Sequence, residues 1–215
     1  APGTATITAI PAADTGKAAT ATVTLSPYTV DVSGYVIQSD FQFQTLSVHA
    51  IDSATGWLRP VSQRLVSPDP NVAPYRTIVH PSGKFVYADW TFTGIQGFAI
   101  DSGGALTLIP GSPFSMPNSR PSAMTITPDG KYFYALDWGL GGPFWGFAVK
   151  QSTGALTPLA GYSPWWAGFN GEALLVHPNS KFLYAFNAAL SGGYCPVNGF
   201  IEVFAIDGAT GALTF

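Results

Sequence analysis

Residues 100–107 read Ile100-Asp101-Ser102-Gly103-Gly104-Ala105-Leu106-Thr107, and the chain repeats this phrase with small changes. The other copies are Ile51-Asp52-Ser53-Ala54-Thr55-Gly56-Trp57-Leu58, Val149-Lys150-Gln151-Ser152-Thr153-Gly154-Ala155-Leu156-Thr157 and Ile206-Asp207-Gly208-Ala209-Thr210-Gly211-Ala212-Leu213-Thr214. The first residues of the four copies are separated by 49, 49 and 57 positions. A period in this range means that one structural unit recurs along the chain.

Each unit consists of short apolar segments separated by tight turns. In the second unit a strand ending at His80 precedes the turn 81–84, and strands follow at 85–89, 94–100 and 106–109. Four short strands repeated with a period near 50 are typical of β-propeller blades. The sequence therefore predicts an all-β chain that forms a partial β-propeller of about four blades, each a four-stranded antiparallel sheet.

The propeller region is expected to span residues 28–215. Its blades are predicted at residues 33–66, 74–112, 121–161 and 172–215. The first blade is incomplete, because no inner strand with a His-Pro or Thr-Pro turn precedes it. Closed propellers have about four to eight blades. We therefore expect the remaining strands to come from a longer polypeptide or from another chain, and the two outer blades to expose apolar residues such as Val36, Ile37, Phe200 and Val203.

Residues 1–27 have a different pattern. Thr and apolar residues alternate over 3–9 and again over 19–25, around a turn at Asp14-Thr15-Gly16-Lys17. Alternation with a period of two on both sides of a Gly-containing turn predicts a β-hairpin. These segments resemble the last two strands of bacterial Ig-like domains, so this region is expected to be the C-terminal hairpin of such a domain.

The amino-acid composition excludes some classes of binding partner. Hydrophobic residues make up 47% of the chain, charged residues 10%, and the net charge is −3. The chain has no basic stripe for nucleic acid and no apolar run long enough to span a membrane, so neither partner is expected. A surface rich in uncharged polar residues indicates an exported protein, secreted or at the cell surface. Cys195 is the single cysteine, which excludes an intrachain disulfide.

The repeated phrases resemble the lactonase-type seven-bladed propellers, which include 6-phosphogluconolactonase-like and carboxymuconate-cycloisomerase-like proteins. The resemblance lies in His80-Pro81-Ser82-Gly83-Lys84-Phe85-Val86-Tyr87, in residues 98–107 and in Pro110-Gly111-Ser112-Pro113-Phe114, and it spans about residues 33–215. It implies a propeller whose enzymatic members use His, Arg and Glu side chains at the mouth of the central channel, where the inner strands begin.

The matching positions of this chain hold few such residues. Aligned on the turn prolines 81, 128 and 178, one column contains Arg76, Ala123 and Ala173, and the preceding column contains Tyr75, Ser122 and Glu172. Arg76 could hold a carboxylate or phosphate, and Glu172 could act as a base. These two residues are the catalytic candidates, although together they form only part of an acid–base set.

The histidines favour a structural role. His80 and His177 each precede a turn proline, and Thr127 occupies the same place in the third unit. A hydrogen bond within the turn suits all three residues, whereas a metal ligand does not. No metal site and no cofactor are predicted.

Aromatic residues are concentrated in the loops of the third and fourth units. Packing between blades accounts for some of them, but exposed rings beside Gly, Ser and Asn would suit a sugar or a protein partner. The binding candidates are Trp138, Trp145, Trp165, Trp166 and Tyr194.

The sequence is compatible with three functions. The main expectation is an exported, noncatalytic propeller that serves as an interaction or structural module. The first alternative is a lactone hydrolase of the 6-phosphogluconolactonase type with its site at the central channel. The second is a subunit of an extracellular assembly or filament, either a homo-oligomer or one completed by the rest of the same polypeptide, because open strand edges pair with neighbours.

Overall fold

The computed structural model describes residues 3–9, 19–25, 32–40, 42–65, 74–90, 94–116, 121–137, 144–159, 171–187 and 200–215. All regular structure in these residues is β-strand. The strands are β1 (Gly3–Ala9), β2 (Ala19–Leu25), β3 (Val32–Asp40), β4 (Thr45–Asp52), β5 (Leu58–Leu65), β6 (Thr77–Val79), β7 (Phe85–Trp90), β8 (Gly94–Ile100), β9 (Leu106–Leu108), β10 (Phe114–Ser115), β11 (Pro121–Ile126), β12 (Tyr132–Asp137), β13 (Phe144–Val149), β14 (Leu156–Pro158), β15 (Gly171–Val176), β16 (Phe182–Asn187), β17 (Phe200–Ile206) and β18 (Leu213–Thr214).

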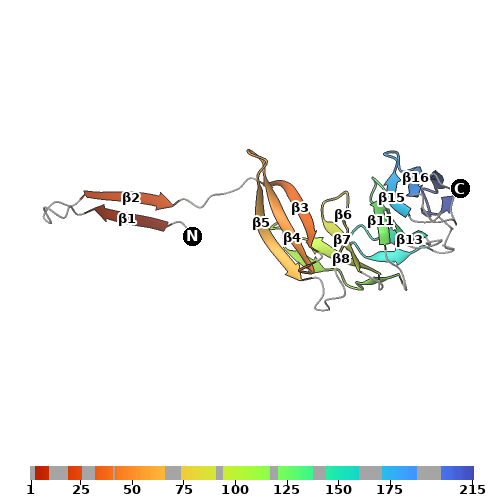
Figure 1. The fold of residues 1–215 in the computed structure, drawn as a ribbon, viewed down its shortest axis with the longest axis horizontal. Coiled ribbons are helices and arrows are strands. Elements are labelled where there is room, and N and C mark those ends of the chain that lie inside the picture. The colour runs from red at the N-terminus through yellow and green to blue at the C-terminus, as the bar shows by residue number, and fades with distance from the viewer. Residues whose placement is uncertain are drawn as a thin grey trace.

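Four antiparallel sheets follow one another as the predicted blades (Figure 1). Blade 1 is β3-β4-β5, blade 2 is β6-β7-β8-β9 with β10 also paired to β8, blade 3 is β11-β12-β13-β14, and blade 4 is β15-β16-β17-β18. The all-β partial propeller is thus confirmed. Blade 1 has three strands in the described residues, as its missing inner-strand motif predicted.

The strand limits differ from the predicted ones mainly at the inner strand of blade 2. The sequence predicted a strand over residues 74–80, but β6 covers only Thr77–Val79. The corresponding strands β11 and β15 begin earlier, with Pro121 paired to Asp137 and Gly171 paired to Asn187. The start of the inner strand in blade 2 is therefore held by other contacts.

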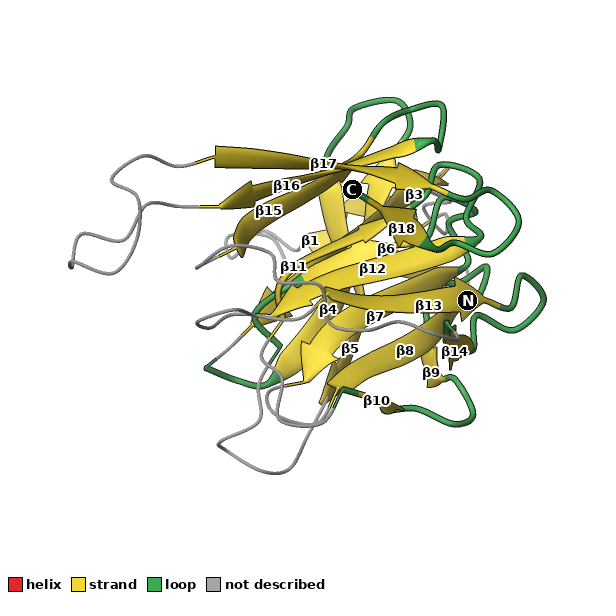
Figure 2. Cartoon of the chain, turned by 90° about the vertical axis from the view of Figure 1, so that its right-hand side faces the viewer, coloured by secondary structure: helices red, strands yellow, loops and turns green. Residues whose placement is uncertain are grey.

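Turn chemistry places the hairpins at one end of the blades (right in Figure 2). Asp207 accepts hydrogen bonds from the N–H groups of Ala209 and Thr210, and Asp52 and Asp101 cap their own turns in the same way. His80 bonds to Ser82 in its turn and to the carbonyl oxygen of Gly130 in blade 3, through 2.8 and 2.9 Å contacts. The expected turn role of His80 is confirmed.

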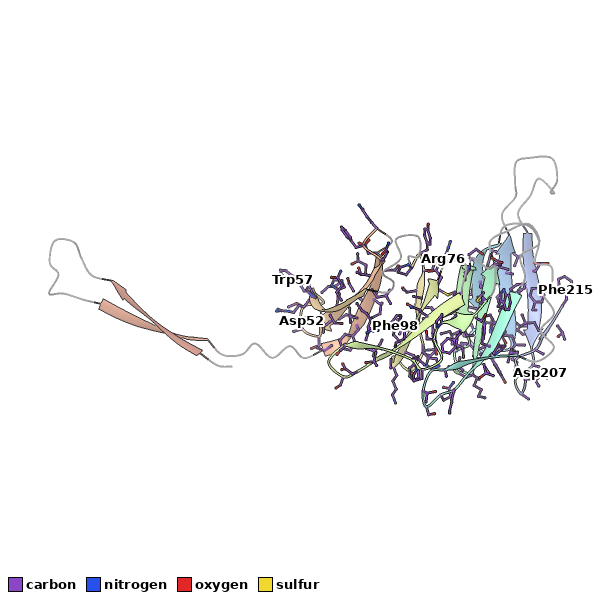
Figure 3. The ribbon with its side chains drawn as sticks, turned by 90° about the horizontal axis from the view of Figure 1, so that it is seen from below. Asp52, Trp57, Arg76, Phe98, Asp207 and Phe215 are labelled. Carbon is purple, nitrogen blue, oxygen red and sulfur yellow. The ribbon has the colours of Figure 1, made fainter. Side chains whose placement is uncertain are left out.

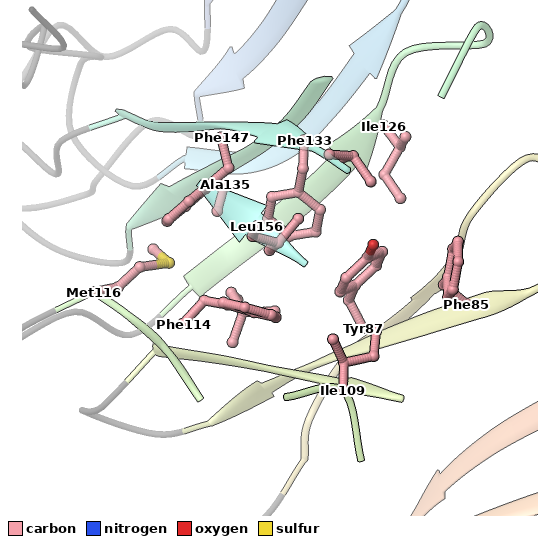
Figure 4. Packing of buried hydrophobic residues seen from close by; sticks show 12 residues of the cluster. Phe85, Tyr87, Ile109, Phe114, Met116, Ile126, Phe133, Ala135, Phe147 and Leu156 are labelled. Atoms are coloured by element: carbon pink, nitrogen blue, oxygen red, sulfur yellow. The ribbon is translucent and has the colours of Figure 1, made fainter. Parts of the chain in front are cut away.

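Both faces of the middle blades are buried, and this explains their continuous apolar strands. In β12, Phe133 and Ala135 pack toward blade 2, whereas Tyr134 and Leu136 pack toward blade 4. The cluster between blades 2 and 3 includes edge-on aromatic contacts of Phe133 with Tyr87 and with Phe147 (Figure 4). A third cluster joins blades 1 and 2 around Leu46, Val48, Val86, Ala88, Phe98 and Leu106.

Tyrosine hydroxyls join each blade to a turn of the next. Tyr87 donates to the carbonyl oxygen of Gly154 at 2.7 Å, and Tyr134 donates to that of Gly211 at 2.8 Å. These glycines lie at equivalent positions of successive blades and have φ of 74° and 73°. Gly154 also lies against the ring of Phe85 in the preceding blade. The glycine of this turn therefore allows the neighbouring blade to approach closely and also accepts the tyrosine hydrogen bond.

The outer face of blade 4 is apolar and uncovered. Leu175, Ile201 and Val203 are 56%, 57% and 46% exposed. Val36 of blade 1 is also exposed, as expected, but the expectation for Ile37 was wrong, because Ile37 packs against the cluster between blades 1 and 2. The side chain of Phe200 lies outside the described residues.

Strands β1 and β2 form the predicted hairpin, with Gly3 paired to Leu25 and Ala9 paired to Ala19. Its pairing involves no strand of the blades, and Figure 1 draws it apart from them. The Ig-like origin of this hairpin stays a prediction.

We expect Gly154→Ala to destabilise the protein more than Gly56→Ala. Both glycines have positive φ, so alanine costs about 1–2 kcal/mol at either position. A Cβ at Gly154 would lie 2.6 Å from Phe85, whereas nothing lies within 4 Å of one at Gly56. Overpacking adds about 1–3 kcal/mol to the first variant. Urea unfolding measures the difference, and equal losses would contradict the packing account.

Candidate active site at the starts of the inner strands

The inner strands bring the predicted column together. Arg76, Ala123 and Ala173 line one pocket of about 240 Å³, which Ser122 also lines. The remaining lining residues are Thr77, Met124 and Leu174. The small side chains of Ala123 and Ala173 leave open space beside the arginine, so the pocket offers one cation and room for a ligand.

Arg76 is exposed at this pocket, at the edge of the blades opposite Asp207 (Figure 3). Its Nη1 donates to the carbonyl oxygen of Pro121 at 3.3 Å, which ties the start of β6 to the start of β11. The other guanidinium N–H groups provide donors that suit a carboxylate or phosphate. Arg76 is therefore placed where an anionic ligand could reach it.

Glu172 lies in the inner strand of blade 4, which is separated from the inner strand of blade 2 by β11 of blade 3. It lies in β15 at a register shift between Gly171, which pairs with Asn187, and Ala173, which pairs with Phe186. Ala173 lines the pocket, so the backbone places Glu172 one residue from its wall. The Glu172 side chain lies outside the described part of the chain. The residue at the same position in blade 3, Ser122, is buried and donates to the carbonyl oxygen of Leu136 at 3.1 Å.

Asp89 is a residue of the site that was not predicted from the sequence. This residue of β7 is 3% exposed, and its Oδ1 accepts hydrogen bonds from the N–H groups of Tyr75 at 2.6 Å and Arg76 at 2.9 Å. Burial raises the pKa of Asp89 to about 6, although the N–H groups of Arg76 and Tyr75 and the charge of Arg76 oppose this rise. The sequence does contain one sign of this residue's special role, because Asp89 occupies the repeat position where blades 3 and 4 have Leu136 and Phe186.

The aromatic candidates are only partly described. Trp145 is half-buried and packs against the cluster between blades 2 and 3, and its Nε1 is buried with no partner among the described residues. Trp138, Trp165, Trp166 and Tyr194 lie outside the described residues, as does Cys195. The binding role of the five aromatic residues stays a prediction.

The described residues contain no group of three or more His, Cys, Asp and Glu side chains that could hold a metal ion. In the same part of the chain, no helix is long and apolar enough to cross a membrane. His177 accepts a hydrogen bond from the N–H of Asn179 within its turn, so it has the role expected from the sequence.

Comparisons with known proteins agree with this architecture. The family described as "Lactonase, 7-bladed beta-propeller" matches residues 15–215. Its match begins within the segment between the two strands of the N-terminal hairpin. No curated protein matches the chain.

Solved structures match the fold. A provisionally assigned 6-phosphogluconolactonase from Bacteroides uniformis is 24% identical with a TM-score of 0.65, over 84% of this chain and 50% of that chain. The periplasmic gluconolactonase of Pseudomonas aeruginosa is 20% identical with a TM-score of 0.61, over 84% of this chain and 52% of that one. The chain therefore spans about half the length of these structures.

We expect Asp89→Asn to change how stability depends on pH. Because the pKa of Asp89 is raised from 3.8 to about 6 in the folded protein, its contribution to stability is full below pH 3.8 and is lost as the pH rises through 6. The variant lacks this loss, so its stability relative to the natural protein should increase by about 2–3 kcal/mol between pH 4 and pH 7. Urea unfolding at the two pH values tests this, and a constant difference would contradict it.

Proposed function

Because the chain belongs to the lactonase family of seven-bladed β-propellers, we propose that the protein hydrolyses lactones at the pocket beside Arg76. Family membership and the gluconolactonase named among the similar structures favour this reading over the noncatalytic module. The observation that carries the proposal is the pocket itself, in which a single exposed arginine faces open space left by two alanines. The substrate class that fits is a sugar lactone carrying an anionic group.

Arg76 supplies the binding energy for that anionic group. A guanidinium holds a phosphate or carboxylate with two parallel charge-assisted hydrogen bonds, which also fix its orientation. The bond from Nη1 to the Pro121 carbonyl restricts the rotation of the side chain before the ligand arrives. Orientation of this kind brings the lactone ring to one place over the inner strands.

Glu172 is the residue proposed to activate water. Lactone hydrolysis begins when water attacks the ring carbonyl carbon and loses a proton, and it ends when the ring C–O bond breaks and the ring oxygen takes up a proton. A carboxylate next to the bound ring serves both proton transfers, first as base and then as acid. The backbone position of Glu172 beside the pocket wall supports this role.

The proposal predicts turnover of 6-phosphogluconolactone by the natural full-length protein. Arg76→Ala should lower kcat/KM about 10²-fold, because charge-assisted hydrogen bonds contribute about 1.5–3 kcal/mol each. Arg59→Ala is the matched control, since Arg59 pairs with Asp52 in blade 1 at 3.7 Å and does not line the pocket. Acid release followed at constant pH measures both variants.

Glu172→Gln should act on kcat more than on KM, because the lost group moves protons and does not hold the anion. A general base contributes about 10²–10⁴-fold. Absence of hydrolysis by the natural protein, with phosphorylated and unphosphorylated lactones alike, would contradict the proposal. In that case the interaction module and the extracellular assembly would be the functions to test next.

A further inference from the structure

We propose that Asp89 is a positioning residue, whose buried carboxylate holds the start of β6 so that Arg76 stays aimed at the pocket. For the chemistry of the ligand this inference rests on the proposed function. The role itself concerns the geometry of the arginine, which can be measured without a substrate.

The repeats provide the first argument. Ala123 pairs with Leu136 in blade 3, and Ala173 pairs with Phe186 in blade 4. The same register places Arg76 opposite Asp89 in blade 2, where the Asp89 N–H donates to the Arg76 carbonyl oxygen at 3.1 Å. Among these three blades, the one with arginine in the pocket column is also the one with a carboxylate opposite it.

The hydrogen bonds provide the second argument. In blades 3 and 4 the starts of the inner strands are held by backbone pairing at Pro121 and Gly171. Strand β6 begins only at Thr77, and one oxygen of Asp89 accepts both the Tyr75 and the Arg76 N–H groups instead. The carboxylate thus fixes the backbone of the residue that carries the guanidinium.

The energetic cost provides the third argument. A buried carboxylate is unfavourable unless hydrogen bonds and a nearby positive charge offset its desolvation. The equivalent positions of blades 3 and 4 have Leu136 and Phe186, which fill the same place in the sheet without this cost. At this register position blade 2, unlike blades 3 and 4, has an aspartate, and it lies directly opposite Arg76. The buried Asp137 of blade 3 lies one position further along, opposite Pro121. An aspartate placed directly opposite Arg76 is the pattern expected if the residue serves the arginine.

A chemical probe tests the role without a ligand. Phenylglyoxal modifies accessible arginines, and mass spectrometry reads its rate at each one. We expect Asp89→Leu to raise the rate at Arg76 at least threefold and to leave the rate at Arg59 unchanged. Asp89→Asn retains an oxygen acceptor and should restore most of the slow rate.

Binding of 6-phosphogluconate, measured by calorimetry on the natural full-length protein, provides the second readout. Asp89→Leu should weaken it about tenfold, and Asp89→Asn should recover most of that loss. In Arg76→Ala the leucine substitution should cause no further weakening. Asp207→Asn is the matched control, because Asp207 also accepts two backbone N–H groups but lies at the opposite end of the blades.

The outcomes separate the two proposals. Unchanged modification and binding in Asp89→Leu would overturn the positioning role, as would losses that simply add to those of Arg76→Ala. If the natural protein binds no 6-phosphogluconate and hydrolyses no lactone, the proposed function fails, and the modification rate at Arg76 still decides the role of Asp89. Should the leucine variant not fold, Asp89→Glu, which moves the carboxylate by one methylene group, replaces it with the same expected losses.

Discussion

The contact between an aromatic ring of one blade and a glycine turn of the next determines the spacing of the whole structure. Gly104, Gly154 and Gly211 pack against Tyr35, Phe85 and Tyr132 of the preceding blades. Each of these glycines has a positive φ, which side chains rarely adopt, and each leaves no room for a Cβ. The tyrosine hydroxyls that donate to Gly154 and Gly211 then satisfy a turn carbonyl that would otherwise be buried without a partner.

This spacing creates the pocket. When the blades approach at the glycine turns, their inner strands converge, and the side chains at the strand starts meet around a shared space. In blades 3 and 4 the residues at this position are small, namely Ala123 and Ala173. Arg76 departs from the repeat in this place and adds a positive charge to the pocket lining. Asp89, which does not line the pocket, binds the backbone N–H of Arg76.

The repeat made the fold predictable. Asp101 and Asp207 begin turns that end in glycine, and this spacing located the outer hairpins correctly because the turn chemistry is local. The inner strand of blade 2 was predicted too long, because a side chain replaces its first backbone pairs. Ile37 was misplaced because alternation along a strand does not tell which face a neighbouring blade will cover.

The site was predictable only in part. Aligning the turn prolines found Arg76 and its pocket, since equivalent positions of a repeat lie side by side. Asp89 escaped notice because its role depends on a cross-strand partner 13 residues earlier in the sequence. The most direct measurement is a crystal structure of the natural full-length protein with 6-phosphogluconate. We expect the phosphate or carboxylate to be bound to Arg76 between β6, β11 and β15. A ligand bound elsewhere, with the Arg76 pocket empty, would contradict the proposed site.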